Sequence, residues 1–190
     1  MLLIDVINDF DFEGSGGLVR AAVRASRPIE ALCRRARAAR VPIVYVNDNF
    51  GRWRSDFATT IRECTRPELP ASAVSERLRP RGGDYFILKP QHSGFYSTPL
   101  DLLLAHLRVH TLVLTGFAAN LCVLFTANDA HMRGYRLVVP SDCTASNSPS
   151  LTRSALVHVE TALGGDVRPS SRVDFARLAR QRKKPRGQTF

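Results

Sequence analysis

Short apolar runs alternate along this chain with segments in which apolar residues recur at helical spacing. The runs predict six strands, at residues 2–6, 42–47, 84–89, 111–116, 135–139 and 165–168. The helical spacing predicts helices at 28–39, 99–108 and 149–163, and a further helix that begins at Asn120 and ends near Gly134. Because strands and helices alternate, the pattern favours one parallel sheet with right-handed crossovers and with helices on both faces.

Local signals indicate where three of these helices begin. Pro28 suits the first turn of the helix at 28–39, because the N–H group that proline lacks would have no partner there. Thr98 is the expected cap of the next helix, with Pro99 inside its first turn. Asn120 is the expected cap of the helix that follows the fourth strand.

Three residues with chemically reactive side chains lie at the ends of apolar runs. Asp5 closes the first run, Lys89 closes the third, and Cys122 follows the fourth. Ligands of open parallel sheets bind at the carboxyl ends of the strands, so these residues are candidates for one site. Each has a structural alternative. Asp5 or Asp9 can instead form a turn or a helix cap that closes the strand. Lys89 can be a solvated residue, and Cys122 a small core residue.

Cys122 lies in the first turn of its predicted helix. Free backbone N–H groups and the positive end of the helix dipole lie there, and both favour a thiolate over a thiol. A neutral cysteine is a weak nucleophile, so it needs a base and a positive potential. Asp5 is the candidate base, since it can accept the thiol proton and return it to a leaving amine. Lys89 is the candidate positive charge, which also holds Asp5 in place.

The three residues belong to three motifs that follow one another in order: D-x-x-N-D-F at 5–10, K-x-x-x-S-x-F-x-x-T-x-L at 89–100, and G-(apolar)-A-x-(N/D)-x-C at 116–122. Together the motifs resemble those of the isochorismatase-like cysteine hydrolases. That family includes nicotinamidases, N-carbamoylsarcosine amidases, and ureidoacrylate and biuret amidohydrolases. The resemblance extends from Leu2 to about Leu163.

The resemblance implies a fold and a set of roles. The implied fold is a Rossmann-like three-layer α/β/α sandwich around a six-stranded parallel sheet. Asp5, Lys89 and Cys122 would form its catalytic triad, and the backbone N–H groups of Ala118 and Cys122 its oxyanion hole. In the family, the turn into that hole contains a cis peptide bond, here between Phe117 and Ala118. The resemblance also implies a homo-oligomer, either a dimer or a tetramer.

The expected activity is hydrolysis of a small amide, ureido or carbamoyl compound through a thioester acyl-enzyme. Two alternatives stay open. Isochorismatase-type vinyl-ether hydrolysis needs an acid but no thiol nucleophile, and Cys122 argues against it. A non-catalytic or nucleic-acid-binding protein on the same fold is supported only by the basic tail at 181–190. That tail has no interleaved aromatic residues and the chain has no nucleic-acid-binding motif, so we do not expect nucleic acid to be a partner.

No metal or cofactor is expected. Metal-dependent nicotinamidases carry an aspartate–histidine cluster after the second strand, whereas this chain has no histidine between Pro28 and His92. Its five histidines share no metal-binding spacing, and we interpret His92 as a loop residue. Arg52 and Arg54 are candidates for contact with a substrate carboxylate. Five aromatic residues are candidates for the walls of a substrate pocket or, alternatively, for the core: Phe10, Trp53, Phe95, Tyr96 and Phe117.

Composition is that of one globular domain. The chain has 190 residues, 44% of them hydrophobic and 23% charged, which suits a single domain at 1–180 with a buried core. Residues 51–83, rich in arginine and proline, predict an inserted lid or loop with short helices. No apolar stretch reaches membrane-spanning length, so we expect no membrane partner.

The cysteine spacing and the net charge give two further expectations. The four cysteines show no C-x-x-C or zinc-ligand spacing, which favours a reduced, cytoplasmic protein, and Cys33 is expected in the core. The net charge of +10 comes from arginines scattered through the predicted helices and from the tail at 181–190. We interpret that tail as a solvated terminus.

Overall fold

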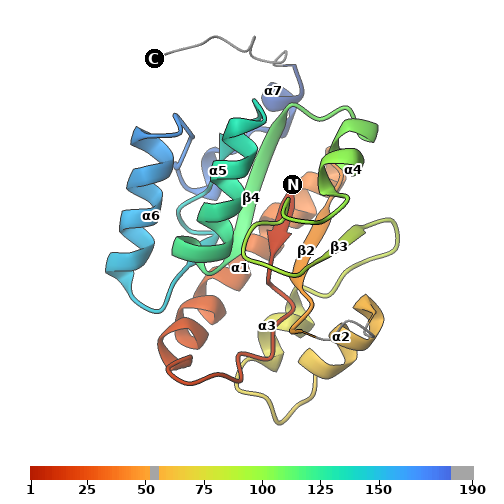
Figure 1. The fold of residues 1–190 in the computed structure, drawn as a ribbon, viewed down its shortest axis with the longest axis vertical. Helices are drawn as coiled ribbons and strands as arrows, with labels where there is room; N and C mark the ends of the chain where they lie inside the picture. The colour runs from red at the N-terminus through yellow and green to blue at the C-terminus, as the bar shows by residue number, and fades with distance from the viewer. Residues whose placement is uncertain (52–55, 181–190) are drawn as a thin grey trace.

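The computed structural model describes residues 1–51 and 56–180, and a six-stranded parallel sheet forms its centre (Figure 1). The path through the sheet is β3-β2-β1-β4-β5, and β6 pairs with β4 further along that strand. Every strand pair is parallel, as the sequence predicts. The strands are β1 (Leu2–Ile4), β2 (Val44–Asp48), β3 (Tyr85–Lys89), β4 (Thr111–Phe117), β5 (Arg136–Val138) and β6 (Thr144–Ala145).

The helices of the described residues connect these strands. They are α1 (Gly16–Ala38), α2 (Phe57–Cys64), α3 (Ser72–Arg77), α4 (Leu100–His106), α5 (Leu124–Met132), α6 (Pro149–Thr161) and α7 (Phe175–Arg180), with a π-helical turn η1 (Ala119–Val123) and a 3-10 turn η2 (Ser170–Arg172). Within the described residues, no helix has the length and apolar character needed to cross a membrane. Helices α2 and α3 lie in the segment where short helices are expected, and a lid function for that segment stays a prediction.

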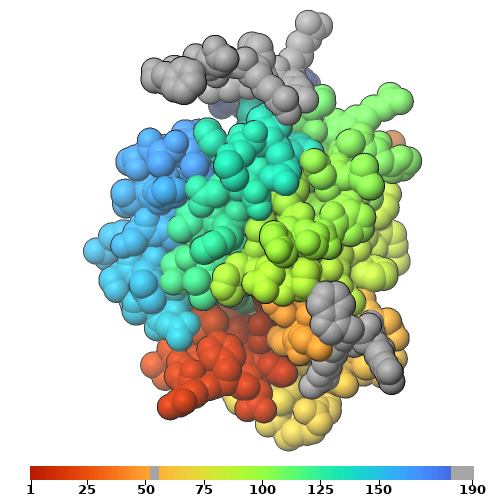
Figure 2. All heavy atoms as spheres, viewed as in Figure 1, coloured from red at the N-terminus to blue at the C-terminus, as the bar shows by residue number. Residues whose placement is uncertain are grey.

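Different helices cover the two faces of the sheet. Successive residues of a strand point to opposite faces, so Leu3 of β1 packs in one core cluster whereas Leu2 and Ile4 pack in the other. The first cluster lies against α1, and the second lies against α4, α5 and α6. Figure 2 shows α5, α6 and the segment around α4 side by side on the outer surface of the second face. The three-layer α/β/α arrangement is therefore confirmed.

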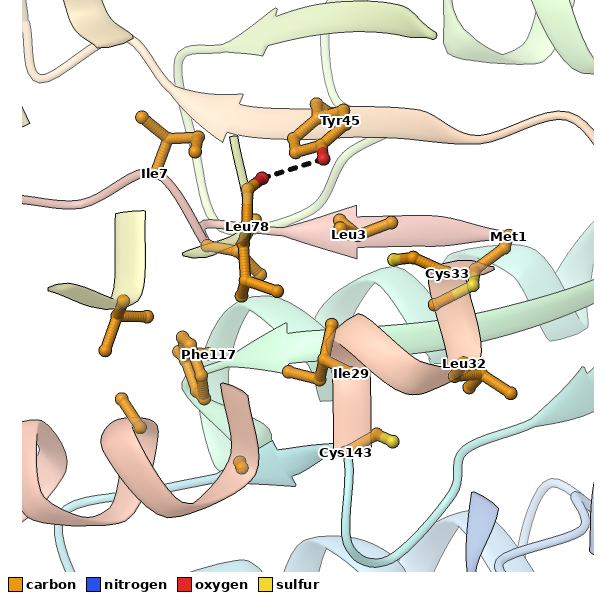
Figure 3. Close-up of a cluster of buried hydrophobic side chains, with 14 of the residues drawn as sticks. Met1, Leu3, Ile7, Ile29, Leu32, Cys33, Tyr45, Leu78, Phe117 and Cys143 are labelled. Atoms are coloured by element: carbon orange, nitrogen blue, oxygen red, sulfur yellow. Dashed lines mark hydrogen bonds between the residues drawn. The ribbon is translucent and has the colours of Figure 1, made fainter. Parts of the chain in front are cut away.

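The core under α1 is shown in Figure 3. Ile29, Leu32 and Cys33 of this helix lie against the side chains of the sheet. Cys33 is only 3% exposed, which confirms its predicted place in the core. The hydroxyl of Tyr45 is the polar group of this cluster, and it donates a hydrogen bond of 2.8 Å to the Leu78 carbonyl. The cluster thus buries a tyrosine without leaving its hydroxyl unpaired.

Helix α1 begins earlier than the sequence predicts. It starts at Gly16, and Pro28, expected in its first turn, lies in its interior. The apolar face continues on the N-terminal side of the proline through Leu18, Ala22 and Ala25, all of which are buried. Packing of this longer face against the sheet outweighs the backbone hydrogen bond that an interior proline removes.

The sixth strand also differs from the prediction. The segment at 165–168 forms no strand, and its contact with the sheet is an isolated bridge between Asp166 and Val138 of β5. The strand that completes the sheet is β6, which pairs Thr144 with Gly116 and Ala145 with Phe117. A strand of two residues is too short to show a hydrophobic period, so the sequence pattern gave no sign of it.

Gly116 of β4 lies too close to β1 to carry a side chain. A Cβ atom there would lie 1.9 Å from the Ile4 carbonyl oxygen, and the φ of Gly116 is +112°. We expect Gly116→Ala to lower the free energy of unfolding by more than about 2 kcal/mol, because backbone strain and a backbone clash combine. Gly82→Ala is the matched control, since a Cβ atom at Gly82 has no neighbour within 4 Å. Urea denaturation measures both variants, and equal midpoints would contradict this prediction.

Candidate active site

The ends of three neighbouring strands place Asp5 and Lys89 in contact. The chain leaves β1 at Asp5 with a φ of 50°, so the strand ends at Ile4 rather than at residue 6 as predicted. The Asp5 carboxylate then lies 3.0 Å from the Nζ atom of Lys89, at the end of β3. Its other oxygen accepts a hydrogen bond of 2.7 Å from the N–H of Asp48, at the end of β2. The Lys89 side chain is fully buried.

Cys122 joins this pair from the fourth strand end. It lies in η1, the turn that follows β4 and continues directly into α5, so its predicted place in the first turn of a helix is confirmed. Its Sγ atom lies 3.5 Å from Lys89 Nζ, and its thiol is hydrogen-bonded to Asp5. The structure therefore brings together the three residues that the sequence singled out.

The turn that carries Cys122 contains the expected cis peptide bond between Phe117 and Ala118. The carbonyl of Ala118 accepts hydrogen bonds from the N–H groups of Leu121, at 3.1 Å, and Val123, at 3.2 Å. These two bonds close the turn around the backbone of Cys122.

Asn120 is not the cap of this helix, contrary to the prediction. The capping position is Ala118, without a side-chain hydrogen bond, and Asn120 lies inside the turn. The N–H of Asn120 donates a hydrogen bond of 3.2 Å to the hydroxyl of Ser146, which follows β6. A serine from another segment thus satisfies a donor that the sequence assigned to a local cap.

Lys89 keeps its proton in this environment. Burial alone would lower the pKa of its ammonium group, but the carboxylates of Asp5 and Asp48 raise it above the usual 10.5. The pKa of Asp5 is raised by burial, against the opposing effects of the Lys89 charge and of hydrogen bonds from Cys122 and Asp48. A carboxylate with a raised pKa is a better proton acceptor than an exposed aspartate.

Burial works against the thiolate that a helix start favours at Cys122. Burial and the negative charge of Asp5 raise the pKa of the Cys122 thiol to about 12, against the opposing effect of Lys89. The position at the start of a helix does not compensate for the loss of water around the sulfur. The proton of Cys122 must therefore leave as the sulfur reacts, and Asp5 is the carboxylate in hydrogen-bond contact with it.

Two polar residues at the site were not assigned a role from the sequence. Asp48 has one carboxylate oxygen 3.4 Å from Lys89 Nζ, and its side chain is 33% exposed. His92, interpreted as a loop residue, has its Nδ1 atom 3.7 Å from Cys122 Sγ. The rule that located Asp5 and Lys89 also applies to Asp48, since it is the last residue of β2. Asp9, by contrast, makes a local turn in which its carboxylate accepts a hydrogen bond of 3.2 Å from the N–H of Asp11.

The other residues of the lysine motif hold the loop after β3. The hydroxyl of Ser93 bonds to the carboxylate of Asp129 on α5, and the N–H of Gly94 donates to the hydroxyl of Thr126 at 3.0 Å. Leu100 is buried at the start of α4, and the Thr98 hydroxyl accepts a hydrogen bond of 3.2 Å from its N–H. Thr98 thus makes a capping contact, while the formal capping position is Pro99.

The aromatic candidates occupy different environments. Phe10 and Phe117 are buried, with ring centroids 6.0 Å apart, in the core cluster against α1. Phe95 is buried beneath the guanidinium of Arg133, which lies 4.6 Å from its ring centroid, and Tyr96 is 59% exposed. The burial of Phe10, Phe95 and Phe117 agrees with the core alternative, and a role in the pocket stays a prediction. Arg52, Trp53 and Arg54 lie outside the described residues, as does the basic tail at 181–190.

The described residues form no metal cluster beside the site, and two cavities lie elsewhere on the surface. Among residues 1–51 and 56–180, no group of three or more histidine, cysteine, aspartate or glutamate side chains could hold a metal ion. Two surface cavities, of about 520 and 500 Å³, are lined by residues other than Asp5, Lys89 and Cys122. One lies beside β3 and α4, and the other lies between α1 and α6. Neither cavity is lined by Phe10, Phe95, Tyr96 or Phe117, the predicted pocket aromatics that the structure describes.

Comparison with known proteins identifies the family. The isochorismatase domain model matches residues 1–170. The isochorismatase family protein YaaI of Bacillus subtilis is 39% identical over 167 residues, which cover 88% of this chain and 91% of YaaI. The ureidoacrylate amidohydrolase RutB of Methylobacterium radiotolerans is 34% identical over 178 residues, which cover 82% of this chain and 66% of RutB.

A solved structure of an amidase is also similar to this chain. The N-carbamoylsarcosine amidase of Thermoplasma acidophilum superposes with a TM-score of 0.69 at 28% sequence identity. The match covers 91% of this chain and 96% of the amidase. It extends over the parallel sheet and its flanking helices, so the similarity is not confined to the motifs. The chain belongs to the isochorismatase family, and it is a hydrolase of that family.

Proposed function

We propose that this protein is a metal-independent cysteine hydrolase that cleaves a small amide, ureido or carbamoyl compound through a thioester intermediate. The observation that carries this proposal is the contact of Cys122 with both Asp5 and Lys89 at the ends of adjacent strands. A nucleophile, a base in contact with it and a positive charge that orients the base are the groups that nucleophilic catalysis requires.

In the first step, the sulfur of Cys122 attacks the carbonyl carbon while Asp5 accepts the thiol proton. The raised pKa of Asp5 reduces the difference in proton affinity between the two groups. The carbonyl oxygen becomes an oxyanion, and the backbone N–H groups of Ala118 and Cys122 stabilise it. Lys89 keeps its proton throughout and holds the carboxylate in place.

In the second step, the tetrahedral intermediate collapses. The C–N bond breaks, Asp5 returns its proton to the leaving nitrogen, and the acyl group stays on Cys122 as a thioester. Asp5, ionised again, then takes a proton from a water molecule that attacks the thioester carbon. The acid leaves, and the thiol regains its proton from Asp5. Each half of the reaction uses the same acid–base group.

The substrate class is supported by the relatives and by the nucleophile. RutB is named for the hydrolysis of ureidoacrylate, and the Thermoplasma enzyme for the hydrolysis of N-carbamoylsarcosine. Both names describe the cleavage of a C–N bond next to a carbonyl carbon. Vinyl-ether hydrolysis needs no thiol, so it gives no role to the contacts that Cys122 makes.

Cys122→Ala is expected to abolish hydrolysis of small amides, by a factor of about 1000 or more, because the nucleophile is lost. Asp5→Asn and Lys89→Ala are expected to lose a similar, non-additive share, since the three side chains act as a unit. Ammonia release from a panel of amides and ureido compounds measures the rates, and intact-mass analysis detects the acyl adduct. Cys33→Ala, in the core, is the control and should keep its turnover. Wild-type turnover by Cys122→Ala would exclude the thiol mechanism.

The pH dependence of kcat/KM follows from the pKa directions. Asp5 must be ionised to accept a proton, and its pKa is raised, so activity should fall with decreasing pH at a point above about 4, where exposed aspartates titrate. No loss is expected up to about pH 10, because the pKa of Lys89 is raised above 10.5 and that of Cys122 is about 12. Measurement of kcat/KM across this pH range tests both the expected loss at low pH and the expected constant activity at higher pH. A loss of activity between pH 7 and 9 would contradict the assignment.

Activity is expected to survive exhaustive chelation. The proposed steps use only side chains and backbone groups of the chain, and no step requires a Lewis acid. Dialysis against a strong chelator, followed by rate measurement and elemental analysis, checks this expectation. Loss of activity that one equivalent of zinc or iron restores would show that the reaction depends on a metal.

A further inference from the structure

His92 lies next to the reactive sulfur, on an exposed part of the loop after β3, and has no role in the mechanism above. It follows Lys89 by three residues, in the loop after β3, and its side chain is exposed. Its Nδ1 atom lies 3.7 Å from Cys122 Sγ, within hydrogen-bond range for sulfur. Its ring packs edge-on against Phe125 of α5, with centroids 5.4 Å apart, which restricts the orientation of the imidazole.

The backbone next to His92 is tied to the helix that carries Cys122. The N–H of Gly94 donates a hydrogen bond of 3.0 Å to the Thr126 hydroxyl, which in turn donates one of 2.7 Å to the carbonyl of Cys122. Gly94 is also packed closely, since a Cβ atom there would lie 2.7 Å from a methyl group of Val46. The position of His92 relative to the sulfur is therefore fixed by backbone and buried contacts, although its side chain is exposed.

The hydrogen bonds that the Cys122 sulfur already makes limit the role that His92 can have. The thiol has one proton, and that proton lies in the hydrogen bond with Asp5. Lys89 has only donor groups to offer the sulfur, and the tautomer of His92 that is protonated at Nδ1 is the form that can donate to it as well. We propose that His92 is a fourth catalytic side chain, which donates its Nδ1–H to the sulfur of Cys122 and stabilises the thiolate as it forms. This inference rests on the proposed function of Cys122 as the nucleophile.

Lys89 alone is a poor stabiliser of the thiolate because its charge is shared. Its ammonium lies 3.0 Å from Asp5, 3.4 Å from Asp48 and 3.5 Å from Cys122, so two carboxylates compete with the sulfur for one cation. A second donor from the solvent side offsets that competition. The proton of Cys122 passes to Asp5 in this scheme, and His92 keeps its own proton, so it acts as a donor and not as a base.

The experiment measures the reactivity of Cys122 without a substrate. The second-order rate constant for alkylation by iodoacetamide at about pH 8 is proportional to the thiolate fraction, because this pH lies well below the thiol pKa of about 12. The titratable groups that face the sulfur are Asp5, Lys89 and His92, with Asp48 behind Lys89. The rate constant thus reports how these groups stabilise the thiolate.

His92→Ala is expected to lower this rate constant by about tenfold, corresponding to one unit in the thiol pKa. A decrease distinguishes the proposal from a mere change in access to the sulfur. Removal of an exposed side chain by itself would give the reagent easier access and raise the rate constant. His92→Asn places an amide N–H near the former Nδ1 position and is expected to restore the rate constant to within about threefold of wild type. His106→Ala, which replaces an exposed histidine on α4, is the control and should match wild type.

Three outcomes would overturn the proposal: alkylation of His92→Ala at or above the wild-type rate, a His92→Asn variant as slow as His92→Ala, or an equal loss in His106→Ala. Mass spectrometry assigns the alkylated residue, and urea denaturation confirms that the variants are folded. Hydrolysis is measured in parallel. If Cys122→Ala retains activity, the proposed function fails whatever His92 does. If Cys122 is essential and His92→Ala alkylates normally, only the role of His92 fails.

Discussion

The buried ion pair between Lys89 and Asp5 is the interaction on which the rest of the site depends. A fully buried ammonium is strongly destabilising unless an opposite charge lies next to it, so removal of either partner leaves an uncompensated charge in the core. The order β3-β2-β1 meets this requirement, because it brings the ends of three neighbouring strands to one edge of the sheet. The early end of β1 follows from the same requirement, since Asp5 must turn out of the strand to reach the lysine.

Burial has a second effect on the chemistry of the cluster. The same loss of water that raises the pKa of Asp5 also raises that of Cys122, so burial works against the charged form of each group. Transfer of the proton from sulfur to carboxylate exchanges one negative charge for another and leaves the net charge of the buried region unchanged. The reaction therefore starts without bringing an additional charge into the core.

The sequence predicted the features of the fold and site that depend on side-chain patterns. Five of the six strands, the strand-end positions of Asp5 and Lys89, and the helix start at Cys122 all follow from apolar runs and their ends. The features it did not predict depend on backbone geometry or on contacts between distant segments. Strand β6 has two residues and no period, and Ser146 takes the place of a local cap. The raised pKa of Cys122 depends on burial, which a helix position alone does not reveal.

The hydroxyl of Thr126 links the loop after β3 to the backbone of Cys122. It is neither a nucleophile nor a base, yet it fixes the distance between two of the motifs that identify the family. Most positions of the lysine motif do the same kind of work, since Ser93, Thr98 and Leu100 hold the loop and make no contact with the sulfur in the described structure. A descendant of this chain that lost the thiol would keep most of the motif, because the loop would still need to fold. Such a protein would be recognised as a member of the family by its shape, while its capacity for this chemistry would be decided at residue 122.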